Sequence, residues 1–167
     1  MQRRRPHAER PGPGQESVWD YPRPPRIDPC TALVEVELGG STVARTTRAL
    51  RVLETSHPPT YYLPRAAFAP GTLRPADGNS FCEWKGAAAY LDVVTEGRTA
   101  HRAAWCYPDP AAPFAALRDH VALYPGQMDR CLVDGEVVRA QPGGFYGGWV
   151  TSSVVGPFKG GPGTWGW

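Results

Sequence analysis

The sequence predicts a mainly β fold in a single domain, with one α-helix packed on a curled antiparallel sheet. The chain has 19 glycines and 19 prolines among 167 residues, so only short elements fit between these interruptions. Several of the short segments alternate apolar and polar residues, which is the pattern of strands with one buried face. The dipeptides Gly39-Gly40 and Asp134-Gly135 supply the tight turns of antiparallel hairpins.

The first predicted hairpin covers residues 33–45, where two alternating segments flank the Gly39-Gly40 turn. Residues 48–54 and 61–63 are the next strand candidates. Residues 82–94 follow as one long strand with a bulge at Gly86, because an isolated glycine inside a strand pattern favours a bulge.

Residues 98–106 are predicted to return antiparallel to that strand after a turn at Glu96-Gly97. Residues 129–139 form the last predicted hairpin, around Asp134-Gly135. Residues 113–124 are the one predicted α-helix, since Pro113 suits a first helical turn. The apolar residues of this segment recur at helical spacing: Phe114, Leu117, Val121 and Tyr124.

The domain is expected to span residues 16–167, after a disordered tail at residues 1–15. The tail has no apolar periodicity and gathers arginines among prolines and glycines: Arg3, Arg4, Arg5 and Arg10. It lacks the apolar core of a signal peptide, and no run of about 18 apolar residues occurs in the sequence. A net charge of +2 favours neither nucleic acid nor a membrane as partner. We expect a cytoplasmic protein, and the oligomeric state is left open.

The four cysteines are spread along the chain without a C-x-x-C pair: Cys30, Cys82, Cys106 and Cys131. Structural zinc sites usually contain such close pairs, and disulfide scaffolds are shorter and richer in cysteine. We therefore expect buried free thiols, no bound metal and no cofactor.

Residues 48–62 contain the first group of candidate site residues. As a strand, residues 48–54 place Arg48 and Glu54 on one face but about 20 Å apart, so these two cannot pair directly. Pro58-Pro59 then stiffens the loop that holds His57. Glu54 and His57 form an acid/base pair in the functional interpretation. In the alternative, His57 binds backbone groups and Glu54 is a surface residue at the end of a strand.

Lys85 is the third catalytic candidate, because only Lys85 and Lys159 are lysine among the 18 basic residues. Lysine and arginine differ in chemistry, so a retained lysine indicates a use for an amine. Lys85 would contact an anionic ligand or act as a nucleophile. In the alternative it faces solvent beside Glu83. Whether Lys159 and the glycine- and tryptophan-rich end contribute to a site is left open.

Aromatic residues supply the walls of the expected site. We expect ligand contacts from Arg48 and from four aromatic side chains: Tyr62, Trp84, Tyr107 and Trp149. Concave, mostly aromatic surfaces with a few convergent polar groups are the usual form of small-molecule sites.

Five segments of the sequence also resemble a known family: Val18–Arg26, Glu54–Tyr62, Cys82–Gly86, Trp105–Pro108 and Gly143–Trp149. They are similar to the bacterial and fungal proteins of "domain of unknown function 427", over about Glu16 to Trp167. The resemblance implies a β-tent-like fold of coiled antiparallel sheets, akin to folds that elsewhere carry a zinc knuckle. This chain lacks the paired C-x-x-C of those relatives. Family naming leans towards nucleotidyl transfer, but the Gly-Ser/Asp-x-Asp pattern of that chemistry is absent from the sequence.

Three hypotheses about function follow, and whether the protein is an enzyme is left open. The first is a small-ligand pocket with acid/base chemistry by Glu54 and His57. The second is a non-catalytic module that recognises a peptide, a modified side chain or a cation through an aromatic cage. The third, nucleotidyl transfer, rests on family naming alone. A domain whose aromatic residues are all core is the alternative to all three.

Overall fold

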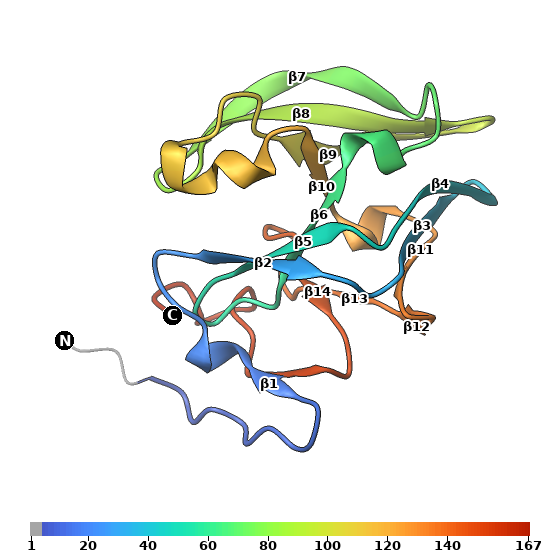
Figure 1. Cartoon of the computed structure of the whole chain (residues 1–167). Coiled ribbons are helices and arrows are strands. Elements are labelled where there is room, and N and C mark those ends of the chain that lie inside the picture. Colours follow the sequence, from blue (N-terminus) through green and yellow to red (C-terminus); the bar gives the residue numbers. More distant parts are fainter. Residues whose placement is uncertain (1–4) are drawn as a thin grey trace.

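A computed structural model describes residues 5–167 of the chain, which are mainly β as predicted (Figure 1). The strands are β1 (Glu16–Ser17), β2 (Arg26–Cys30), β3 (Val34–Leu38), β4 (Ser41–Thr46), β5 (Ala49–Leu53), β6 (Thr60–Pro64), β7 (Leu73–Cys82), β8 (Gly86–Thr95), β9 (Arg98–Cys106), β10 (His120–Leu123), β11 (Arg130–Val133), β12 (Glu136–Val137), β13 (Arg139–Ala140), β14 (Trp149–Val150) and β15 (Val154–Val155). Short 3-10 helices connect some of them: η1 (Val18–Asp20), η2 (Arg65–Ala67), η3 (Ala112–Leu117) and η4 (Pro125–Gln127).

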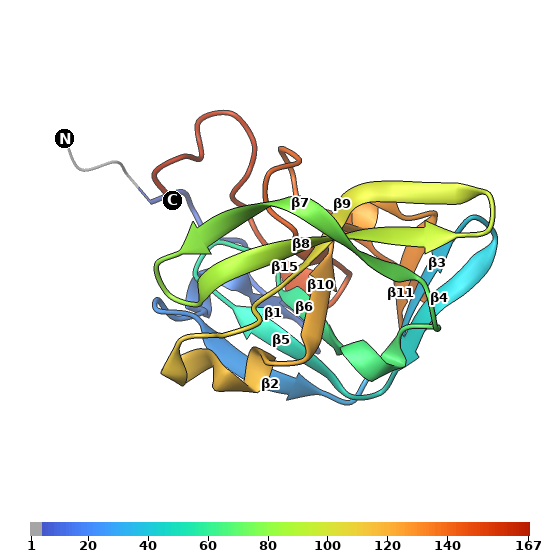
Figure 2. The ribbon, with the colours of Figure 1, turned by 90° about the horizontal axis from the view of Figure 1, so that it is seen from above.

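A seven-stranded sheet in the order β2-β5-β6-β10-β9-β8-β7 forms the frame of the domain. It is antiparallel throughout, and so is the four-stranded sheet β12-β11-β3-β4. The larger sheet is curled, so that β7 and β8 lie above β2 and β5 in Figure 1, and β10 lies between β8 and β2 in Figure 2. This curl gives the sheet a concave side.

The predicted hairpins at residues 33–45 and 129–139 are confirmed as β3–β4 and β11–β12. The strand predictions at residues 48–54, 61–63 and 98–106 are confirmed as β5, β6 and β9. Register follows the apolar alternation, since the residues of β3 are alternately buried and half-buried.

The predicted α-helix at residues 113–124 is wrong. Residues 112–117 form η3, and residues 120–123 are strand β10, which pairs with β6 on one side and β9 on the other. Asp119 has a φ of 59°, which no continuous helix can contain. Val121 and Ala122 are both fully buried, in different apolar clusters. A central strand buried on both faces resembles a helix in its apolar spacing.

The single strand predicted at residues 82–94 is also wrong. β7 ends at Cys82, residues 83–85 form a turn, and β8 begins at Gly86. Gly86 has a φ of +108° and closes this hairpin, so it is not a bulge inside a strand. Lys85 therefore lies in a turn.

Two strands without a sequence prediction, β2 and β7, occupy the two edges of the large sheet. Each contains a proline, Pro29 in β2 and Pro75 in β7. Proline cannot donate a ladder hydrogen bond, so its presence argues against a strand in the sequence. It is tolerated in β2 and β7 because both lie at an edge of the sheet.

The two faces of the large sheet pack into separate apolar clusters. Tyr61 and Trp149 belong to the larger cluster, with ring centroids 4.7 Å apart. Tyr62 points the other way, into the cluster with Trp105. Only Tyr62 therefore faces the concave side.

Residues 5–15 contain no strand or helix. The Glu9 N–H donates to the Gly156 carbonyl at 2.9 Å, and the Gln15 side chain donates to the Ser152 carbonyl at 2.9 Å. Disorder of residues 1–15 stays a prediction. Residues 1–4, which include Arg3 and Arg4, lie outside the described residues. None of the helices in the described part of the chain is long and apolar enough to cross a membrane.

Candidate functional site

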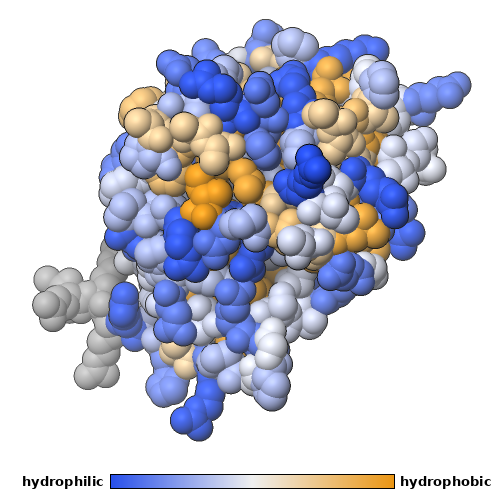
Figure 3. Space-filling model, viewed as in Figure 1, coloured by the Kyte–Doolittle hydropathy of each residue, from blue (hydrophilic) through white to orange (hydrophobic). Residues whose placement is uncertain are grey.

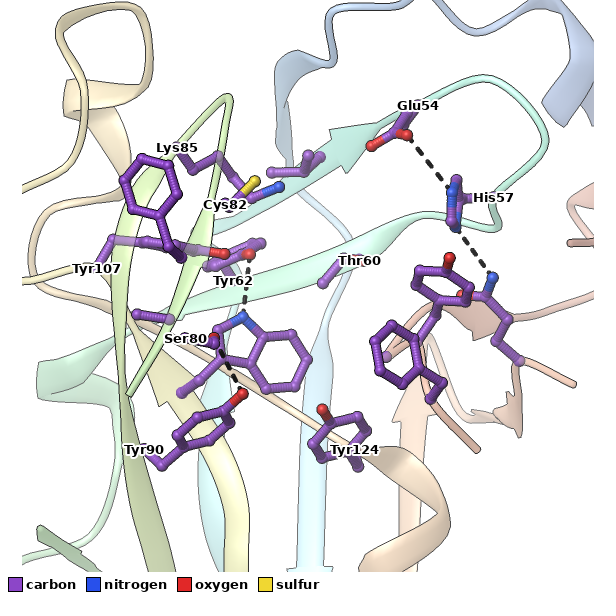
Figure 4. Close-up of a pocket in the computed structure, with 18 of the residues that line it drawn as sticks. Glu54, His57, Thr60, Tyr62, Ser80, Cys82, Lys85, Tyr90, Tyr107 and Tyr124 are labelled. Atoms are coloured by element: carbon purple, nitrogen blue, oxygen red, sulfur yellow. Dashed lines mark hydrogen bonds and ion pairs between the residues drawn. The ribbon is translucent and has the colours of Figure 1, made fainter. Parts of the chain in front are cut away.

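A cavity of about 600 Å³ occupies the concave side of the curled sheet (Figure 4). We call it the aromatic cavity. Five aromatic side chains from the sheet and its connections line it: Tyr62, Tyr90, Trp105, Tyr107 and Tyr124. Phe81 and Phe145 also line it and are 78% and 68% exposed, so they stand at its mouth.

The aromatic wall is fixed by contacts among its own members. The Trp105 indole N–H donates to the Tyr62 hydroxyl at 3.3 Å, and the Trp105 and Tyr124 rings lie 4.7 Å apart. The ring centroids of Tyr62 and Tyr107 lie 6.4 Å apart. Burial raises the pKa of both Tyr62 and Tyr107, so their hydroxyls are neutral groups that can donate hydrogen bonds.

Glu54 and His57 meet at the polar end of the cavity. Glu54 directly follows β5, and the His57 N–H donates to the Glu54 carbonyl at 3.0 Å, which closes a tight turn. Buried Ser56 has a φ of 73°, and its carbonyl accepts from the Lys159 N–H at 2.9 Å. The turn brings Glu54 Oε2 to 3.5 Å from His57 Nε2. The acid/base hypothesis requires this proximity.

Gln141 holds the other side of the His57 ring. Its Oε1 accepts from the Gly148 N–H at 3.0 Å, so its Nε2 is the atom near His57. That nitrogen donates to the Lys159 carbonyl at 2.8 Å and lies 3.0 Å from His57 Nδ1. Because an amide NH₂ has only hydrogens to offer, Nδ1 is the acceptor. The neutral ring therefore carries its hydrogen on Nε2, which faces Glu54.

The carboxylate of Glu54 lies among positive charges. Burial by itself would raise the pKa of this carboxyl, but the hydrogen bond and charge of His57, with the charges of Arg23 and Lys85, lower it below the usual range. Arg23 Nη2 lies 3.4 Å from Glu54 Oε2. Glu54 is therefore ionised at neutral pH and serves as a fixed acceptor.

Both lysines of the chain line the aromatic cavity. Lys85 Nζ lies 5.8 Å from the centroid of the Tyr107 ring. Lys159 Nζ lies 5.6 Å from the centroid of Tyr146 and donates to the main-chain oxygen of Trp167, the last residue of the sequence, at 3.2 Å. Burial, followed by the charge of Arg23, lowers the pKa of Lys159 against the opposing effect of Glu54.

Five of the eight candidate residues come together in this cavity: Glu54, His57, Lys85, Tyr62 and Tyr107. The other three do not line it. Arg48 is exposed at the opposite end of β5, Trp84 lies beside Phe114 in a second cavity, and Trp149 is fully buried against Tyr61. Trp149 thus packs in the core and lines neither of these two cavities.

Several residues that line the cavity were not predicted as site residues: Tyr90, Trp105, Tyr124, Gln141 and Tyr146. The Tyr146 ring lies edge-on to His57, with centroids 4.7 Å apart. The scarcity of lysine was the signal for Lys159. Gln141 offered none, because its role depends on the contact of β13–β14 with the loop after β5.

The second cavity, of about 770 Å³, lies between η3 and β2. Prolines and apolar side chains line most of it, including Ile27, Leu50 and Phe114. On the face seen in Figure 3, apolar side chains gather in this region among polar ones. Glu83 and Arg26 are its charged residues, and Arg26 is already paired with Asp28 at 2.9 Å.

The four cysteines are free, and Cys82 lines the aromatic cavity. Cys106 and Cys131 are buried, and burial raises the pKa of both thiols. In residues 5–167, no three His, Cys, Asp or Glu side chains are grouped closely enough to hold a metal ion.

The model of one protein family matches residues 26–134, which is more than half of the chain. Its description is "Domain of unknown function (DUF427)". The matched segment contains Glu54, His57 and Lys85, whereas Gln141 and Lys159 follow it. Among curated proteins, no match is found.

Proposed function

The chain belongs to the family of the domain of unknown function 427, and from this premise we propose that it binds a small organic molecule in the aromatic cavity. The observation that supports this best is the arrangement of Glu54, His57 and Gln141 opposite a wall of aromatic rings. Small-molecule sites commonly combine such a wall with a few oriented polar groups. The flat part of the ligand would pack on the rings, and its polar part would reach Glu54 and His57.

Proton transfer at the polar end is part of the proposal. The separation of 3.5 Å between Glu54 Oε2 and His57 Nε2 is longer than a strong hydrogen bond. A ligand hydroxyl or amine can therefore contact both atoms. Glu54 would accept the proton of that group, and the Nε2–H of His57 would donate a hydrogen bond to it. Gln141 and Arg23 keep the two groups in place.

The experiment is a thermal-shift screen of a metabolite set on the wild-type chain and on Glu54→Gln and His57→Ala. A ligand that binds the native state raises Tm in proportion to the logarithm of its concentration over Kd. We expect compounds that stabilise the wild type and lose most of this effect in both variants.

The control is His101→Ala, because the chain has a second histidine–carboxylate pair outside the cavity. His101 Nδ1 lies 3.6 Å from Asp92 Oδ2, and the His101 side chain is 79% exposed. Ligand stabilisation should survive this substitution. Hits that stabilise all four proteins equally would count against the proposed site.

A non-catalytic aromatic cage for a cationic ligand is the second candidate. The Tyr62 and Trp105 rings stand at 88° to each other, as the walls of such a cage do, and the Glu54 carboxylate is near. Lys85 and Lys159 oppose a cation in the same cavity. Stabilisation by quaternary ammonium compounds that is unchanged in His57→Ala would favour the cage over acid/base chemistry.

Four further properties belong to the proposal. A cytoplasmic location agrees with four free cysteines, which are typical of reducing compartments. A β-tent type and a bacterial source follow from the resemblance in sequence, with the curled antiparallel sheet in support of the first. Nucleotidyl transfer rests only on the naming of the family.

A further inference from the structure

We propose that the hydroxyl of Tyr107 binds a carbonyl oxygen of the ligand, so that the aromatic cavity selects a flat, uncharged carbonyl compound. This inference rests on the proposed function and adds the chemical class of the ligand. Tyr107, Tyr62 and Trp105 line the cavity together, and we call these three residues the hydroxyl subsite. Four observations support it.

The first observation is that Tyr62 lies beside both other members of the hydroxyl subsite. Its ring centroid is 6.4 Å from that of Trp105 and 6.4 Å from that of Tyr107. All three side chains are buried in one apolar cluster. In Figure 4 the hydroxyls of Tyr62 and Tyr107 point toward each other. The fold thus gathers three polar hydrogens within a wall that is otherwise apolar.

The second observation is that these three hydrogens outnumber their acceptors. The Trp105 indole N–H donates to the Tyr62 oxygen at 3.3 Å. The hydroxyls of Tyr62 and Tyr107 are close enough for a hydrogen-bond interaction, which adds to the larger effect of burial in raising the pKa of Tyr107. That interaction uses at most one of their two hydrogens. Within residues 5–167 the remaining hydroxyl hydrogen has no acceptor.

The third observation is that the Tyr107 hydroxyl is open to the cavity. It has no hydrogen bond of ordinary geometry within residues 5–167, yet Ser56 Oγ is the one fully enclosed side-chain atom there without a partner. The Tyr107 oxygen is therefore accessible. Tyr107 is 6% exposed and Tyr62 is 1% exposed, so Tyr107 is the member of the pair that reaches a ligand. A buried donor without an acceptor is costly, which favours a ligand that supplies one.

The fourth observation is that the aromatic wall disfavours anions. Burial raises the pKa of Tyr62, Tyr107 and Tyr124, because each phenolate would lose its water there. A carboxylate bound beside these rings would lose its water in the same way. The carbonyl of a ketone, aldehyde or amide accepts a hydrogen bond without carrying a charge. Lys85 Nζ lies 5.8 Å from the Tyr107 ring centroid, so a carboxylate probe is included in the test as the anionic alternative.

The test compares three probes that share a phenyl ring: acetophenone, ethylbenzene and benzoate. Ethylbenzene has nearly the shape of acetophenone, with a CH₂ group in place of the carbonyl. Affinities for the full chain are measured by NMR titration with the wild type, Tyr107→Phe and Tyr61→Phe. Tyr61→Phe is the matched control, because it also removes the hydroxyl of a buried tyrosine, but Tyr61 belongs to the cluster on the other face of the sheet and does not line the cavity.

The wild type is expected to bind acetophenone more tightly than ethylbenzene, although the hydrophobic effect alone favours ethylbenzene. Tyr107→Phe should weaken acetophenone binding by about three- to tenfold, the usual contribution of a neutral hydrogen bond, and change ethylbenzene binding by less than about twofold. Tyr61→Phe should change neither affinity by more than about twofold. The carbonyl ¹³C signal of bound acetophenone should move upfield in Tyr107→Phe, because the hydrogen bond that polarises the C=O bond is lost.

The outcomes separate this inference from the proposed function. If ethylbenzene binds the wild type as tightly as acetophenone, and Tyr107→Phe binds both normally, the carbonyl contact is refuted and the cavity proposal stands. Tighter binding of benzoate than of acetophenone would overturn the choice of an uncharged ligand. If no probe binds the wild type, the inference also fails, and the thermal-shift screen alone decides the proposed function. Should Tyr107→Phe not fold, the comparison of acetophenone with ethylbenzene in the wild type still decides.

Discussion

Gln141 controls the state of a single histidine ring. Its amide has only one orientation that satisfies the Gly148 N–H and the Lys159 carbonyl, and this orientation directs an N–H at His57 Nδ1. The hydrogen of neutral His57 is thereby assigned to Nε2, toward Glu54. A buried amide thus positions the ring of the proposed acid/base pair.

This assignment predicts the ¹⁵N shifts of the His57 ring. At a pH where the ring is neutral, Nε2 should show the shift of a protonated nitrogen and Nδ1 that of an acceptor. Gln141→Leu should give a mixture of the two tautomers, whereas Gln127→Leu, an exposed substitution on η4, should not. Observation of an Nδ1–H form in the wild type would show that the amide does not orient the ring.

The ionised state of Glu54 predicts how stability depends on pH. The pKa of this carboxyl is lowered in the folded chain from the ordinary value of 4.5, because the contacts of His57, Arg23 and Lys85 outweigh burial. A lowered pKa stabilises the fold above the unfolded value, and the contribution is lost as pH falls through the folded value. The difference in unfolding free energy between wild type and Glu54→Gln should therefore shrink below about pH 4.5. Urea titrations between pH 3 and pH 7 measure this difference in unfolding free energy. A difference that stays constant over that range would contradict a lowered pKa of Glu54.

At the scale of elements, the segment from β13 to β14 closes the cavity through close backbone contacts. A Cβ atom on Gly148 would lie 2.5 Å from Gln141 Oε1 and 2.6 Å from Pro58 Cγ. Glycine at this position therefore lets the loop after β5 and the β13–β14 segment meet. The position of His57 depends on that contact.

Gly148→Ala should consequently lower stability by about 1–3 kcal/mol, as overpacking of a tight site does. It should also disturb the His57 ring signals, because Gln141 must move. Gly161→Ala is the control, since nothing lies within 4 Å of its added Cβ, and its effect should stay within about 0.5 kcal/mol. Equal denaturation midpoints for the two variants would show that the contact is not tight.

Strands were predicted correctly where one face is buried and the other is more exposed. The predictions failed for a strand buried on both faces and for two strands at the sheet edges. The alternation in β3 is visible in the sequence because its residues are alternately buried and half-buried. β10 is buried on both faces and imitates a helix, and the edge strands β2 and β7 contain prolines. The helix error has a long-range cause: only pairing with β6 and β9 decides that β10 is extended.

For the molecule as a whole, Trp149 connects the curled sheet with the C-terminal segments. It is fully buried, stacks on Tyr61 and donates to the Leu123 carbonyl at 3.3 Å. Its aromatic character suggested a ligand wall, and sequence reasoning could not assign it to the core without knowing which sheet face it covers. The contact between Glu54 and His57 was predictable because the two residues are close in sequence. Gln141 was not, because its partner lies in another element.

Trp149→Phe should lower the unfolding free energy by about 1–3 kcal/mol, because it removes a buried donor and leaves the Leu123 carbonyl without that partner. Trp165 is 74% exposed, and Trp165→Phe should change stability by less than about 0.5 kcal/mol. Chemical denaturation of both variants checks this. Equal losses of unfolding free energy in the two variants would show that Trp149 does not contribute to the core as described.

The most direct test of the aromatic cavity as the ligand site uses the tryptophan indole N–H signals in a ¹H–¹⁵N spectrum during titration with a compound that stabilises the wild type in the thermal-shift screen. Trp105 lines this cavity, Trp84 lines the second one, and Trp149 is buried in the core. The proposed function predicts a saturable shift of the Trp105 signal, reduced in Glu54→Gln at the same concentrations, with Trp84 and Trp149 unmoved. A shift of Trp84 alone, or no shift of Trp105 at any concentration, would contradict it.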